Sequence, residues 1–102
     1  MPRTPPANQN DVFLGMLRET RVKLGITQEV LAERLGFRQT DISKAERGVR
    51  RLDVLELRNW MAALGVPFRD FTRELDERLA SLEALQRHAV GGRTRAAPRN
   101  SG

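Results

Sequence analysis

A short segment in the middle of the chain carries four polar side chains at a spacing suited to recognising another molecule. Gln39 and Thr40 are adjacent, and Ser43 and Lys44 follow four and five positions after Gln39. On a helix, this spacing places them on the face opposite Ile42. Amide and hydroxyl groups both donate and accept hydrogen bonds, and an ammonium group donates them. The segment can therefore read hydrogen-bonding groups on a partner.

Residues for catalysis and metal binding are scarce. A nucleophile activated by a base would need His88, the only histidine, which lies near the end of the last predicted helix. The sequence has no cysteine, no glycine-rich phosphate loop and no histidine or cysteine spacing typical of a metal site. We therefore expect no enzymatic activity, no cofactor and no metal ion.

Positive charge is concentrated in the same part of the chain. The formal net charge is +5, from 18 Lys and Arg against 13 Asp and Glu. Residues 34–51 hold six basic and two acidic side chains, whereas residues 52–88 hold five basic and seven acidic ones. This polarity favours a polyanionic partner. The alternative is that the arginine content reflects only a GC-rich genome.

Apolar residues recur at helical spacing between two polar ends, and no segment alternates as a strand does. The pattern predicts an all-α domain over 11–89, between disordered tails at 1–10 and 90–102. No run of apolar residues is long enough to cross a membrane. The predicted helices cover about 11–24, 27–36, 39–47, 53–65 and 67–89, with Asp11, Thr27 and Asp53 at N-caps and Pro67 at the first position of the last helix.

The second and third predicted helices are short, and a turn containing Gly36 joins them. A DNA-binding helix-turn-helix needs such a pair, because one helix braces against the backbone while the other enters the major groove. The chain also resembles the Cro and phage-repressor type helix-turn-helix proteins, the XRE family. The matching segments are LRETR (17–21), LGITQ (24–28), LAERLG (31–36), QTDISKAERG (39–48), RRLD (50–53) and ALGVP (63–67), within a resemblance that covers about 12–71.

The resemblance implies a compact five-helix, lambda-repressor-like fold and a role for each polar position. Base contacts are expected from Gln39, Thr40, Ser43 and Lys44, and phosphate contacts from Gln28, Arg38, Arg47, Arg50 and Arg51. Arg38 occupies the N-cap of the third helix, where the family often has serine or threonine. Either Arg38 gives up capping for a DNA contact, or Asp41 supplies the missing negative charge.

Two further positions concern the support of the third helix. Arg21 and Glu46 match a pair that forms a salt bridge in the family and locks the first helix to the recognition helix. Ala45 is smaller than the residue often found there, so we expect Phe37, Trp60 or Met61 to fill the core beside it. Trp60 is expected in the core or in a dimer interface.

The last predicted helix is longer than a minimal domain needs. Its apolar stripe continues through Leu82 and Leu85. Its second half either folds back on the same subunit or frays, or it contacts the same helix of a second copy.

The function expected from these features is that of a sequence-specific regulator of transcription, most simply a homodimeric repressor. It would be cytoplasmic, and associated with the nucleoid when bound to DNA. The alternative is an antitoxin-type protein that binds a protein partner, such as a toxin, and regulates its own operon. The basic tail or the outer half of the last helix would then be the partner segment.

Overall fold

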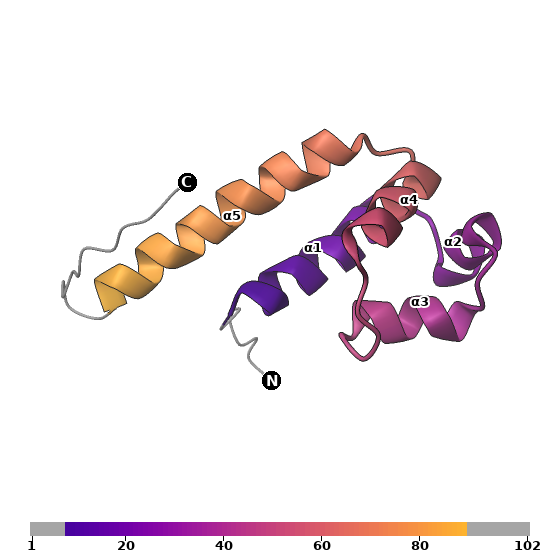
Figure 1. Ribbon diagram of the computed structural model, residues 1–102, viewed down its shortest axis with the longest axis horizontal. Helices are drawn as coiled ribbons and strands as arrows, with labels where there is room; N and C mark the ends of the chain where they lie inside the picture. Colours follow the sequence, from indigo (N-terminus) through magenta and orange to yellow (C-terminus); the bar gives the residue numbers. More distant parts are fainter. Residues whose placement is uncertain (1–7, 90–102) are drawn as a thin grey trace.

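The computed structural model of the chain describes residues 8–89. Within that range it has five helices and no strand: α1 (Gln9–Lys23), α2 (Gln28–Leu35), α3 (Gln39–Glu46), α4 (Val54–Leu64) and α5 (Phe68–Ala89) (Figure 1). The predicted all-α, five-helix fold is confirmed. The expected tails at 1–7 and 90–102, and the side chain of His88, lie outside the described residues.

The first helix starts earlier than predicted. Asn8 is the N-cap of α1, and its side-chain oxygen accepts a hydrogen bond from the Asp11 backbone N–H at 2.9 Å. Asp11 therefore lies inside the first turn, where its negative charge suits the helix dipole. Residues 8–10, expected in the N-terminal tail, are the cap and the first residues of α1.

Most other helix ends agree with their capping residues. Thr27 accepts from the Val30 N–H at 3.1 Å, and Asp53 accepts from the Glu56 N–H at 2.8 Å. Pro67 was expected at the first position of the last helix, but it lies one residue before α5 begins. Its carbonyl accepts from the N–H groups of Asp70 and Phe71.

The core lies where α1, α2, α3 and α4 converge, and α5 extends from it alongside α1 (Figure 1). Its largest fully buried side chains are Trp60, Met16, Leu17, Leu31, Ile42 and Met61. Trp60 was expected in the core or in a dimer interface, and it lies in the core. Phe71 brings α5 onto this core and meets Phe13 of α1 edge to face, with ring centres 6.3 Å apart.

The apolar stripe of α5 continues past the core, so the helix packs partly on its own subunit. Leu75, Leu79 and Leu82 are half-buried, whereas Leu85 is 67% exposed. The described part of α5 thus runs back along α1 and ends with an uncovered leucine. No helix in residues 8–89 is both long enough and apolar enough to span a lipid bilayer.

The residues expected beside Ala45 lie in the core with it. Trp60 and Met61 are fully buried in the same core cluster as Ala45, and Phe37 packs against that cluster. A small pocket of about 70 Å³, lined by Ala45, Phe13, Leu14 and other residues of α1 and the loop after α3, lies nearby.

The loop after α3 depends on one glycine. The N–H of Gly48 donates to the Ala45 carbonyl, and those of Val49 and Arg50 donate to the Lys44 carbonyl. This closure places Gly48 at φ +80°, a left-handed conformation in which side chains are strained. A Cβ added there would also lie 2.8 Å from Leu14 Cδ1. The end of α3 is thus packed directly against α1.

We predict that Gly48→Ala lowers the free energy of unfolding by more than Gly25→Ala does. Gly25 has a similar φ of +72°, but a Cβ there would meet nothing within 4 Å. Both substitutions carry the left-handed penalty of about 1–2 kcal/mol, and only Gly48→Ala must also displace Leu14. Urea denaturation of the two variants measures the difference. Equal losses would show that the contact between Gly48 and Leu14 is unimportant.

Candidate functional site

The polar residues of α3 lie on its outer side. Thr40 and Lys44 are exposed, and Gln39 and Ser43 are partly exposed. Ile42 and Ala45 of the same helix are buried in the core, together with Glu46. The helix therefore presents its hydrogen-bonding groups to solvent, and its inner side is fixed by packing.

A buried ion pair joins α3 to α1. Arg21 Nε donates to Glu46 Oε2 at 2.6 Å, and Arg21 Nη2 donates to Glu46 Oε1 at 3.0 Å. The third nitrogen, Nη1, donates to the Ile26 carbonyl at 2.8 Å. The two side chains are only 9% and 2% exposed. Since the guanidinium plane meets the carboxylate in two bonds, the pair fixes both the spacing and the orientation of the two helices.

The same carboxylate anchors a chain of two amides. Gln28 Nε2 donates to Glu46 Oε1 at 3.0 Å, and Gln39 Nε2 donates to Gln28 Oε1 at 2.6 Å. An ionised carboxylate only accepts hydrogen bonds, so the Gln28 amide must turn its nitrogen toward Glu46 and its oxygen toward Gln39.

The orientation of Gln39 follows from this chain. Its nitrogen faces Gln28, which leaves the Gln39 amide oxygen and one N–H for an outside partner. An acceptor and a donor side by side match N6 and N7 of adenine. The buried pair thus orients a side chain that was expected to read bases.

Gln28 was expected to contact phosphate, and the structure shows that its side chain also makes contacts within the protein. It is the first residue of α2, and its side chain is partly buried between Glu46 and Gln39. The second N–H of its amide is not used in these bonds. Gln28 therefore connects the start of α2 to α3.

At the start of α3 the structure shows the alternative in which Asp41 supplies the negative charge. Asp41 Oδ2 accepts from the Arg38 backbone N–H at 3.0 Å, which places a negative charge in the first turn. The Arg38 side chain is exposed and makes no hydrogen bond to the described residues. Its guanidinium is available for another partner.

The three arginines at the end of α3 have different surroundings. Arg47 is exposed, and its Nε donates to Ser43 Oγ at 3.2 Å. Arg51 is also exposed, and no hydrogen bond links it to the described residues. Arg50, in contrast, pairs with Glu56 and lies over the ring of Phe37. Arg47 and Arg51 are therefore exposed, whereas Arg50 is only partly exposed and is held by partners within the protein.

Sequence reasoning missed two contacts that hold neighbouring helices. Arg34 Nη1 of α2 donates to the Ala63 carbonyl near the end of α4 at 2.9 Å. Arg78 of α5 donates to Glu19 of α1 at 2.9 Å and to Glu74 on its own helix. Only the pair of Arg78 with Glu74 follows from helical spacing. The other contacts join residues that are far apart in the chain.

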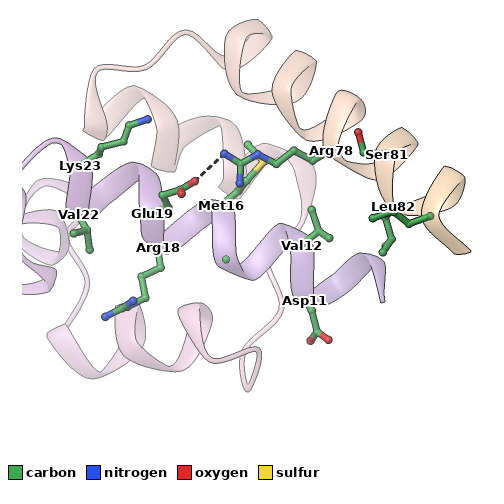
Figure 2. A pocket seen from close by; sticks show the side chains of 12 residues that line it. Asp11, Val12, Met16, Arg18, Glu19, Val22, Lys23, Arg78, Ser81 and Leu82 are labelled. Carbon is green, nitrogen blue, oxygen red and sulfur yellow. Dashed lines mark hydrogen bonds and ion pairs between the residues drawn. The ribbon is translucent and has the colours of Figure 1, made fainter. Parts of the chain in front are cut away.

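An open groove of about 770 Å³ lies between α1 and α5 (Figure 2). Val12 and Met16 point from α1 toward α5, with Met16 beside Arg78, and the ion pair of Arg78 with Glu19 crosses between the helices. Burial opposes the charge on Arg78, but hydrogen bonds to Glu74 and Glu19 and their charges outweigh it, so the pKa of Arg78 is raised. The groove is lined by both apolar and charged groups, and no set of metal-ligating side chains occurs within residues 8–89.

Comparison with known families agrees with this geometry. A helix-turn-helix family model, that of the Cro/C1 type, matches residues 17–71. That match covers more than half of the chain. The protein belongs to this helix-turn-helix family. The matched range contains α2 and α3 together with the turn that joins them. No curated protein matches the chain.

We predict that Glu46→Gln in this helix-turn-helix protein lowers the free energy of unfolding by about 3–5 kcal/mol, because Arg21 stays buried without a counter-charge. The matched control is Glu74→Gln, which breaks the half-exposed pair with Arg78 and should cost about 0.5 kcal/mol. Urea denaturation at neutral pH measures both. Similar losses for the two variants would mean that burial of the first pair has no energetic consequence.

Proposed function

We propose that the protein is a homodimeric repressor that binds specific double-stranded DNA with α3 in the major groove. The observation that carries this proposal is the oriented amide of Gln39 on the outer side of α3, held through Gln28 by the buried pair. A preset donor and acceptor lose little conformational entropy on meeting a base edge. Thr40, Ser43 and Lys44 extend the same reading face.

Phosphate contacts would come from the margins of this face. Gln28 at the start of α2, with Arg38, Arg47 and Arg51, surrounds α3 with groups that can donate to a DNA backbone. Asp41 lies partly buried within the helix turn, and Glu46 is neutralised by Arg21. Arg38, Lys44, Arg47 and Arg51 are all exposed on or beside the face, and this excess of positive charge favours DNA binding. We also propose that the protein acts by binding and not by catalysis.

Binding to DNA from upstream of its own gene tests the proposal. Fluorescence anisotropy should show affinity at least a thousandfold higher than for a shuffled duplex, since specific complexes exceed non-specific ones by about 10³–10⁷. The specific affinity should fall by roughly 10³–10⁵ between about 50 and 200 mM salt. Equal and weak binding of the two duplexes would refute autoregulation through this site and favour either a distant operator or a function in binding a protein partner.

Lys44 provides a test of base reading at a single position. Lys44→Ala should weaken specific binding by about 1–3 kcal/mol, and the loss should depend on the base pair opposite residue 44. Duplexes with each of the four base pairs at successive positions of the bound site identify that pair. A loss of the same size on every duplex would assign Lys44 to the phosphate backbone instead.

The uncovered end of α5 supports the proposed dimer. Leu85 is 67% exposed at the end of a stripe whose earlier leucines are half-buried. In the proposed dimer a second copy covers this leucine, and the two α3 helices enter major grooves about 34–36 Å apart. A different protein, such as a toxin, would use the same surface in the alternative function.

We predict that Leu85→Asp weakens self-association by at least about tenfold, because a charge would be buried in the interface. Ala84→Asp is the control, since Ala84 is exposed and its side chain points about 100° around the helix from that of Leu85. Sedimentation equilibrium of the full chain measures both variants. A chain that is monomeric at all concentrations, or two variants with equal effects, would contradict a dimer through this end of α5.

A further inference from the structure

Arg50 connects three segments around α3. It lies in the loop after α3, and its Nη2 donates to Glu56 Oε2 in the first turn of α4 at 2.9 Å. Its guanidinium carbon lies 5.3 Å from the ring centre of Phe37, in the turn before α3. At this distance a cation is attracted to the face of an aromatic ring. One side chain thus joins the segments on both sides of α3 and fastens them to α4.

The guanidinium of Arg50 is turned into the protein. Its Nη1 is buried and has no hydrogen-bond partner among the described residues, although the side chain as a whole is 34% exposed. Its guanidinium carbon lies over the ring of Phe37 and its Nη2 is bonded to Glu56, so a phosphate contact would require Arg50 to move away from these partners. Arg51, the next residue, is already exposed and needs no such movement.

Glu56, the ion-pair partner of Arg50, is itself fixed by hydrogen bonds. Glu56 Oε1 accepts from the Asp53 N–H at 3.0 Å, and Asp53 in turn accepts from the Glu56 N–H at 2.8 Å. This capping box fixes the carboxylate that Arg50 binds. The Arg50 backbone is fixed as well, since its N–H donates to the Lys44 carbonyl at 3.1 Å. The contacts of Arg50 with Glu56, Phe37 and the Lys44 carbonyl, here called the brace, therefore link the start of α4 to the last turn of α3.

We propose that Arg50 is a positioning residue for DNA recognition, and not one of the phosphate ligands. It sets the position of α3 against α4 through Glu56 and Phe37, and it acts on DNA only through that helix. This inference rests on the proposed DNA-binding function. It replaces the direct phosphate contact expected for Arg50 from the family resemblance.

Glu56→Gln separates the two roles by the sign of its effect. Removing a negative charge near a DNA-binding face strengthens binding if only the electrostatic field matters. Glutamine can still accept from the Asp53 N–H, so the capping box survives, and mainly the ion pair with Arg50 is lost. A positioning role for Arg50 predicts the opposite result, weaker specific binding.

The experiment compares the full chain with Arg50→Gln, Glu56→Gln and Phe37→Leu, and uses Arg51→Gln as the phosphate-contact reference. Anisotropy titrations on the bound upstream duplex are made at several salt concentrations, at a temperature where thermal melts show every variant folded. We expect Arg50→Gln and Glu56→Gln each to lose about tenfold in specific affinity with an unchanged salt slope, and Phe37→Leu to change in the same direction. Arg51→Gln should reduce the slope by about 0.9.

Two results would overturn the proposal. The first is a reduced salt slope for Arg50→Gln together with tighter binding by Glu56→Gln, which would make Arg50 a phosphate ligand. The second is a lower melting temperature with unchanged affinity of the folded variants, which would leave Arg50 with a role in stability alone.

Failure of the proposed function is distinguishable from failure of this inference. If the parent chain binds neither duplex, the DNA-binding proposal fails, and amide hydrogen exchange of the free chain tests the brace. Faster exchange in the last turn of α3 in Arg50→Gln, without faster exchange in α5, would support it. Unchanged exchange there would refute it.

Discussion

The buried ion pair between Arg21 and Glu46 determines where α3 lies, and the proposed DNA face depends on it. Removing two charges from water is costly, and the arrangement compensates by giving both carboxylate oxygens and all three guanidinium nitrogens a partner. Such a pair tolerates little displacement. Because it is bidentate, it fixes the rotation of α3 as well as its distance from α1.

The buried pair of Arg21 and Glu46 also determines how side chains on the outer face of α3 are oriented. Glu46 orients Gln28, and Gln28 orients Gln39, so that a buried charge determines which groups an exposed amide presents. The contacts of Arg50 with Glu56 and Phe37 join the segments before and after the same helix and connect them to α4. Two separate sets of contacts therefore hold the helix that carries the proposed recognition residues. A substitution that leaves the surface residues intact can still change how they meet DNA.

Local signals were enough to predict most of the fold, because the caps at Thr27 and Asp53 act within one helical turn. The start of α1 was missed, since Asn8 follows a proline-containing segment that reads as a tail. The links from Gln28 to Glu46 and from Arg50 to Phe37 were not predictable from spacing. They join different helices and turns, and they exist only once the core has set the distances. The DNA contacts themselves stay predictions.

The most direct test of the account is an NMR titration of the ¹⁵N-labelled full chain with a duplex, at low salt, that reports backbone and side-chain amides together. The account predicts the largest shifts at the start of α2, along α3 and at residues 47–51, including the side-chain amides of Gln28 and Gln39. Shifts concentrated on α5 and on the groove between α1 and α5, with α3 unaffected, would contradict it.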